Sequence, residues 1–223
     1  MKPHLILRGT LVALATVTFC SCASVSVREE TADRGKKPTG PPKRIYVVPF
    51  EVAKTEVGEG AMRQKKGQLK FEGQQLIAKY LVEEMSKNIA PTSVVKSAQA
   101  AGKDGWVITG DLTRISEGSR LFRMAIGLGL GGTKMETDVA VRNAPANAPF
   151  LTFRTSGGSN ATPGAATNPI PFSAAPTAIF QSTKGVTDDA ARTARMITAT
   201  VADYMVKRGW MAPGKVTPPK RAK

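Results

Sequence analysis

The chain has 223 residues, of which 41% are hydrophobic, and this is enough for one globular domain of ordinary size. Lysine and arginine outnumber aspartate and glutamate by 32 to 17, so the formal charge is +15. The one histidine, His4, and both cysteines, Cys20 and Cys22, lie within the first 22 residues. A chain cleaved before Cys22 would therefore have no histidine and no free thiol, which excludes Ser-His and Cys-His nucleophilic pairs and histidine or thiolate metal sites.

An apolar stretch from Leu11 to Phe19 follows two basic residues and ends just before Cys22. A helix needs about 20 residues to cross a bilayer, so this stretch is too short to be a retained anchor. The pattern is typical of a secretory signal that ends at a lipid-accepting cysteine. We predict that residues 1–21 are a lipoprotein signal peptide and that Cys22 carries the lipid that anchors the chain in a membrane.

Ordinary cleavage after Ala23 is the alternative, because Phe19 stands where leucine is usual in a lipoprotein signal, although the small Ser21 fits. A lipidated Cys22 would have no partner for a disulfide. Ala23 directly after the cysteine, in place of aspartate, favours the outer membrane over the inner one. We therefore expect a chain in the bacterial cell envelope that faces the periplasm.

The positive charge restricts the partners. Removing Lys2 and Arg8 with the signal lowers the formal charge from +15 to +13. Outside the inner membrane the available polyanions are anionic lipids and acidic cell-wall polymers, and no nucleic acid is expected. A solvated basic surface, in a species whose proteins are basic in general, is the alternative.

Composition divides the mature chain into three parts. Residues 22–42 are polar and end in a proline-rich run, which predicts a flexible tether. Residues 43–210 are predicted to be an α+β domain, interrupted by a loop at 157–183 that is rich in proline, glycine and alanine. Residues 211–223 are predicted to be a disordered basic tail.

Hydrophobic periodicity predicts the elements of the domain. Arg44–Val52 is an apolar run typical of a strand covered on both faces, and Gln74–Asn88 has the spacing of a helix. Residues 92–97 and 106–115 are predicted strands. In the predicted helix the apolar residues on one face are Ile77, Leu81 and Met85, flanked by Leu76 and Tyr80; in the second strand they are Trp106, Ile108 and Leu112, with Gly110 between them.

The second half of the domain adds a hairpin and a helix. Residues 135–142 alternate, with Met135, Thr137, Val139 and Val141 pointing inward, and residues 150–154 can pair with them. The last helix is predicted to begin at Thr187 and end before Gly209, with Trp210 folded back on its final turn. Its apolar face is formed by Ala190, Ala194, Ile197, Val201, Tyr204 and Met205. The fold class is α+β: one small domain with a mixed sheet of about 4–5 strands, a β-α-β opening, an antiparallel hairpin and a C-terminal helix packed on the sheet.

A glycine-rich segment, residues 118–132, fits neither a dinucleotide fingerprint nor a phosphate loop, because a strand and no helix is expected after it. Alternating glycines among apolar residues allow close approach of another backbone or surface. The candidate contact surface consists of Arg120, Arg123, Gly127, Gly129 and Gly131. Tight packing inside the domain itself is the alternative.

Four basic residues, Arg63, Lys65, Lys66 and Lys70, lie in a predicted loop with no acidic residue between Ala61 and Lys70. We predict that they contact anionic lipid or an acidic polymer.

The segment from Trp106-Val-Ile-Thr-Gly110 to Ile115, with Gly118-Ser-Arg120, the following glycines and the strand that ends at Arg142-Asn143, resembles DUF4410. This is a bacterial lipoprotein family of unknown function, and the resemblance extends from about Lys43 to Gly209. The opening Val48-Pro49-Phe50, with the later Val-Ile-Thr-Gly, is loosely similar to the envelope lipoproteins of curli secretion and penicillin-binding-protein activation. The resemblance implies an envelope lipoprotein with a small α+β domain, and implies no reaction.

We therefore expect an accessory or binding protein with no catalytic residue, no metal and no cofactor. Its partner would be an envelope protein or further copies of itself, in a homo-oligomer or a secretion assembly. The alternative is an envelope enzyme that uses carboxylate or lysine chemistry, for which Asp111 and Glu117 lie near a strand end.

Overall fold

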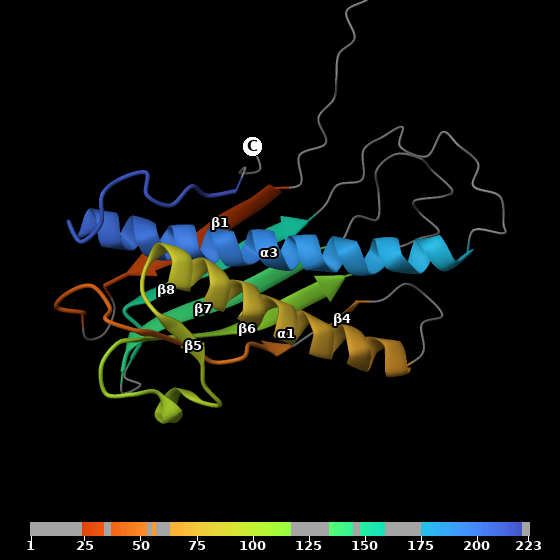
Figure 1. Ribbon diagram of the computed structural model, residues 1–223, viewed down its shortest axis with the longest axis horizontal. Helices are drawn as coiled ribbons and strands as arrows, with labels where there is room; N and C mark the ends of the chain where they lie inside the picture. The colour runs from red at the N-terminus through yellow and green to blue at the C-terminus, as the bar shows by residue number, and fades with distance from the viewer. Residues whose placement is uncertain are drawn as a thin grey trace, which may run out of the picture.

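The computed structural model describes residues 24–33, 37–52, 55–56, 63–116, 134–144, 148–158 and 175–219. Eight strand segments and two α-helices make up this part of the chain (Figure 1). In chain order they are β1 (Ser24–Ala32), β2 (Ile45–Val47), β3 (Glu51–Val52), β4 (Thr55–Glu56), α1 (Arg63–Asn88), β5 (Thr92–Val94), β6 (Trp106–Ser116), β7 (Lys134–Asn143), β8 (Leu151–Gly158) and α3 (Ala175–Lys207), with a short 3₁₀ turn at Ala98–Ala100.

The strands form one mixed sheet in the order β1-β8-β7-β6-β2-β5, and β3 and β4 also pair with β6. The pairs from β1 to β6 are antiparallel, whereas β2 runs parallel to both β5 and β6. The predicted α+β class and the β7-β8 hairpin are confirmed, and so is the β-α-β opening, formed by β2, α1 and β5. The sheet has more strand segments than the 4–5 expected. β1 and the short β4 are additional, and Arg44–Val52 divides at Pro49 into β2 and β3.

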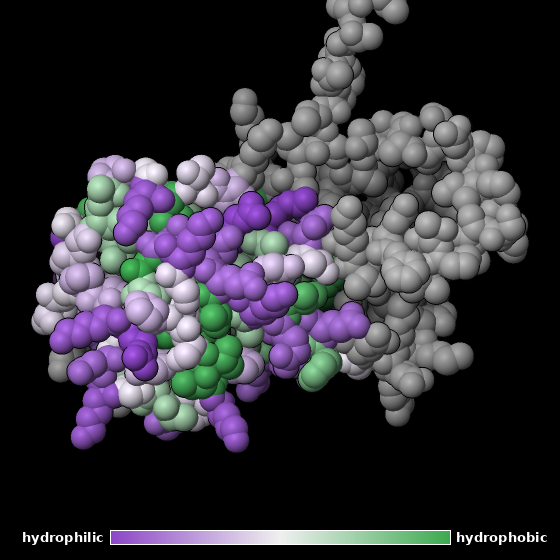
Figure 2. Space-filling view, in the orientation of Figure 1, coloured by the Kyte–Doolittle hydropathy of each residue, from purple (hydrophilic) through white to green (hydrophobic). Residues whose placement is uncertain are grey.

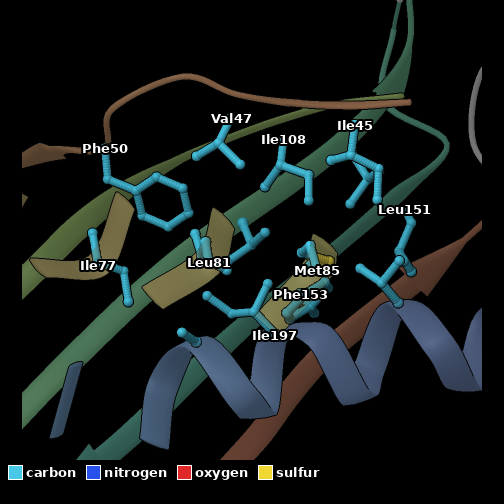
Figure 3. Packing of buried hydrophobic residues seen from close by; sticks show 14 of the residues in the cluster. Ile45, Val47, Phe50, Ile77, Leu81, Met85, Ile108, Leu151, Phe153 and Ile197 are labelled. Atoms are coloured by element: carbon cyan, nitrogen blue, oxygen red, sulfur yellow. The ribbon is translucent and has the colours of Figure 1, made fainter. Parts of the chain in front are cut away.

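Both helices lie on the same face of the sheet, side by side (Figure 1). The predicted apolar face of α1 is buried: Ile77, Leu81 and Met85 have no exposed area, and Figure 3 shows them between the helices and the sheet. All six apolar residues predicted for the last helix are also buried in the core. Seen from the helix side, Figure 2 shows mostly hydrophilic residues and a hydrophobic area over β5, where Val94 is 51% exposed.

The two central strands have the predicted alternation. All four residues expected to point inward on β7 are buried, including Thr137, whose hydroxyl lies 2.7 Å from that of Thr155 on β8. On β6 the backbone at Gly110 lies against the Phe50 ring. A Cβ at this position would lie 2.6 Å from that ring and 2.5 Å from the carbonyl oxygen of Asp138, so only glycine fits.

The flexible tether predicted for residues 22–42 is wrong for Ser24–Ala32, which is strand β1 and pairs with β8. The short alternation Ser-Val-Ser-Val puts Val25 into the core at 1% exposure, and Val27 packs against the core from the same face. A bulge between Arg28 and Thr31, where Glu29 has a φ of 53°, adds twist to this edge strand. The domain therefore includes Ser24–Ala32, which lie well before the predicted start at residue 43.

Both helices begin earlier than predicted. Helix α1 starts at Arg63 and not at Gln74, because the basic segment consists mostly of good helix formers. The segment carries no apolar stripe, so hydrophobic periodicity did not indicate a helix there. Helix α3 starts at Ala175 and not at Thr187, and Pro176 is tolerated in its first turn. The predicted loop at 157–183 is thus shorter than expected, since β8 extends to Gly158 and the helix already includes residues 175–183.

The end of α3 is as predicted. Gly209 has a φ of 72°, and the amides of Gly209 and Trp210 donate hydrogen bonds to the carbonyls of Val206 and Met205 in a Schellman arrangement. The Trp210 ring then packs 6.3 Å from the ring of Tyr204 and 6.2 Å from that of Trp106.

Candidate functional site

The predicted contact residues Arg120, Arg123, Gly127, Gly129 and Gly131 lie outside the described residues, as do Cys22 and Glu117. The structure nevertheless describes the residues on either side of the glycine segment. Ser116 and Lys134, which precede and follow the glycine segment, are paired with each other on β6 and β7. The segment therefore leaves and re-enters the sheet at one end.

The same end of the sheet receives the N-terminal strand. Ser24 pairs with Gly158, Gly158 with Lys134, Lys134 with Ser116, and Ser116 with Glu56. We call these five residues the terminal row. Neighbouring strands are about 4.8 Å apart, so the row extends about 19 Å across the sheet. The cysteine predicted to carry the lipid is two residues before this row.

The predicted basic cluster also lies at this end, on a helix and not in a loop. Gly73 of α1 lies against Ile115, one residue before the terminal row. Arg63 is ten residues nearer the start of the helix, which at 1.5 Å per residue is about 15 Å further along. Both helices extend past the sheet here (Figure 1). Lys70 is exposed, and the neighbouring Phe71 is 62% exposed, a feature that the sequence analysis did not anticipate.

The sheet face opposite the helices has a shallow hollow of about 530 Å³ that crosses five strands. Polar side chains that line it include Glu29, Glu51, Thr109, Asp111, Asp138 and Arg154. Arg154 donates from Nε to Asp138 Oδ1 at 2.6 Å and from Nη2 to Asp138 Oδ2 at 3.2 Å. Its third bond, from Nη1, reaches Glu29 Oε1 at 3.2 Å.

Hydrogen bonds from Arg154 to Asp138, together with the charges of Asp138 and Glu29, raise the pKa of the guanidinium above its ordinary value. Strand register also puts Glu51 opposite Asp111, and Asp111 opposite Asp138. This row of carboxylates suits contact with a cationic group. In the described part of the chain, however, no three His, Cys, Asp or Glu residues come together in a way that could hold a metal ion.

Asp111, considered for the enzymatic alternative, is exposed on this open face. The register that aligns Asp111 with Glu51 and Asp138 pairs strands that are distant in the sequence. From the sequence, only the alternation within each strand indicated which side chains lie on this face.

The N-terminal strand is held against the end of α3. Lys207 Nζ donates to Glu30 Oε1 at 3.0 Å, and Arg208 forms an ion pair with Asp33. The Tyr204 hydroxyl donates to Asp33 Oδ1 at 3.3 Å, and burial raises the pKa of this tyrosine. Strand β1 is thus fixed by the sheet, by the core and by α3.

Neither helix within the described residues combines the length and the apolar character needed to cross a bilayer.

These features define an α+β domain with one helix-covered and one open sheet face, whose terminal row begins two residues after Cys22. The chain belongs to the DUF4410 family, described as a domain of unknown function, whose model matches residues 45–176. The resemblance drawn from the sequence is confirmed, although the match ends before the greater part of α3, which had been included in it.

Among solved structures, a PelC dodecamer from Paraburkholderia phytofirmans is similar at 11% identity and a TM-score of 0.35, over 75% of this chain and 95% of that one. A Xanthomonas campestris protein of the DUF330 family has 9% identity and a TM-score of 0.40, over 78% and 90%. A minor lipoprotein from Acinetobacter baumannii has 10% identity and a TM-score of 0.31, over 71% and 94%. No curated protein matches this chain.

Proposed function

We propose that this protein is a lipoprotein of the bacterial cell envelope, anchored in a membrane through Cys22, with an accessory or binding role and no catalytic activity. The observation that carries the proposal is the apolar stretch that ends at Cys22. Processing before Cys22, like cleavage after Ala23, leaves strand β1 intact, because the strand begins at Ser24. The mature chain would lack the imidazole and thiol groups on which many nucleophilic enzymes depend.

The anchor is tested by replacing Cys22 with alanine and fractionating the cells. The wild-type protein should be in the membrane fraction, with an acylated cysteine as its first residue by mass spectrometry. The Cys22→Ala variant should lose the acyl group and its place in that fraction. Cys20→Ala is the matched control, since it removes a thiol from the same segment and should leave the distribution unchanged. Retention of Cys22→Ala at the wild-type level, with a mature chain that begins at Ser24, would refute the anchor.

The binding role is assigned to the glycine segment, with Arg120, Arg123, Gly127, Gly129 and Gly131 as the contact surface for an envelope protein or a second copy of the chain. Its two ends at the terminal row support this assignment, because they bring the segment to the end of the domain nearest Cys22. Gly129→Leu should abolish co-purification of the partner while the melting temperature stays unchanged. A fall of several degrees in that temperature, with no partner recovered from the wild type, would instead indicate internal packing.

A further inference from the structure

We infer that the first turns of α1, from Arg63 to Phe71, rest on the anionic surface of the bilayer that holds Cys22, with the Phe71 ring in the interfacial region. This inference rests on the proposed lipid anchor. It specifies how the domain is oriented: the terminal row faces the membrane, and the opposite end, with Trp106 at the start of β6 and Trp210 just after α3, points away from it.

The first argument is the length of chain between the lipid and the fold. Two residue steps separate Cys22 from Ser24, and a fully extended chain covers at most about 7 Å in that distance. A tether from residue 22 to residue 42 would have allowed roughly 70 Å. Because Ser24 pairs with Gly158 and the strand is fixed in the sheet, an acyl group on Cys22 holds the terminal row close to the headgroups.

The second argument is the reach of α1 toward that surface. The helix passes the terminal row near Gly73 and continues for ten residues, about 15 Å, to Arg63. This exceeds the reach of the two residues before Ser24. The beginning of the helix therefore meets the headgroup region when the lipid is inserted.

The third argument is the chemistry of the helix. The first eight residues of the helix include Arg63, Lys65, Lys66 and Lys70 and no acidic residue, and Lys70 is exposed. Lys134, in the terminal row, is also exposed. Basic residues beside an exposed aromatic ring are typical of helices that bind at a membrane interface. Phe71, 62% exposed, is the ring that such a surface would take up.

Tryptophan fluorescence can test this orientation, because the two native tryptophans lie far from the terminal row. Trp106 is at the other end of β6, ten residues or about 33 Å from Ser116. Trp210 packs against it, with ring centroids 6.2 Å apart. Quenchers in the bilayer should therefore leave both native tryptophans unaffected.

The first experiment uses the mature chain with Cys22→Ala, so that binding does not depend on the lipid. Phe71→Trp is mixed with vesicles of phosphatidylglycerol and brominated phosphatidylcholine, and its emission should be quenched. Val94→Trp is the matched control: Val94 is 51% exposed but is aligned through Val47 with Ile108, about 26 Å from the terminal row. It should remain unquenched. Equal quenching of the two variants, or none in Phe71→Trp, would overturn the inference.

The second experiment measures vesicle sedimentation for two double charge reversals on the same helix. Lys66→Glu with Lys70→Glu should weaken binding to anionic vesicles by about 30-fold or more, because each cation near such a surface contributes about a factor of five. Lys79→Glu with Lys87→Glu changes the net charge equally, further from the terminal row, and should have a much smaller effect. Raising the salt from 0.1 M to 1 M shortens the Debye length from about 10 Å to 3 Å and should reduce wild-type binding.

Equal losses in both double variants, or equal binding to neutral vesicles, would overturn the inference. So would binding of an acidic polysaccharide without binding of vesicles. None of these results depends on lipidation, whereas the fractionation of Cys22→Ala does, so failure of the membrane contact is distinguishable from failure of the anchor.

Discussion

Replacing Val25 with alanine tests whether the N-terminal segment is a structural strand, on which the orientation at the membrane depends. Val25 is 1% exposed and lies on the core side of β1, opposite Gly157 of β8. The substitution removes two buried methyl groups, each contributing about 0.8 kcal/mol. The cavity that remains adds to this loss, so the free energy of unfolding should fall by about 1.5–3 kcal/mol.

For a chain of this size each kcal/mol lowers the melting temperature by about 2–4 °C, so we expect a fall of about 3–12 °C. The assay is thermal unfolding of the mature chain with Cys22→Ala, followed by circular dichroism and repeated with urea. Val94→Ala is the control, because the same two methyl groups are removed from a side chain that is 51% exposed. Its effect should stay within about 0.5 kcal/mol.

A melting temperature of Val25→Ala equal to that of Val94→Ala would refute the reasoning. It would mean that residues 24–32 contribute nothing to the core and act as the tether that the composition suggested. The short distance between Cys22 and the sheet would then have no consequence for the orientation of the domain.

Two further predictions concern the core and its pH dependence. Gly110→Ala should destabilise the fold by about 1–3 kcal/mol, because its Cβ would lie 2.5 Å from a backbone oxygen. Gly67→Ala, in open space on α1, should stabilise the fold by about 0.5–1 kcal/mol. If both variants shift the melting temperature in the same direction, this account of the packing at Gly110 is wrong. Burial raises the pKa of Tyr204 above its usual value of about 10, so the folded state holds the phenolic proton more tightly than the unfolded state does. The stability that this proton contributes below pH 10 should be lost as the pH rises through the folded-state pKa. Tyr204→Phe should flatten this decline in the urea midpoint between about pH 9 and 11, and an unchanged slope would show that other groups cause it.

Local patterns determined the core faces of the main elements. The alternation on β7 and the helical spacing of Ile77, Leu81 and Met85 each specify one buried face, whatever packs against it. The end of α3 was also predictable, because Gly209 adopts a backbone conformation that other residues avoid. The prediction of a signal before Cys22 and the family resemblance likewise required no knowledge of the fold.

The starts of both helices could not be placed from the apolar pattern. Residues 63–72 are helical although their sequence has no continuous apolar stripe. Composition therefore indicated a basic loop. Its place beside the terminal row, and the exposure of Phe71, became apparent only when the helix was positioned against Ile115.

The tertiary structure alone decided that the N-terminal segment belongs to the sheet. Its sequence offers two valines among polar residues, too little apolar surface to order the segment by itself. The ordering comes from β8, whose Thr155 pairs with Val27 from 128 residues away, and from α3, whose Lys207 and Arg208 bind Glu30 and Asp33. A short sequence determines its own periodicity, but whether it is a strand or a tether depends on a partner elsewhere in the chain. A strand is stable only when its backbone groups are hydrogen-bonded and its apolar face is buried.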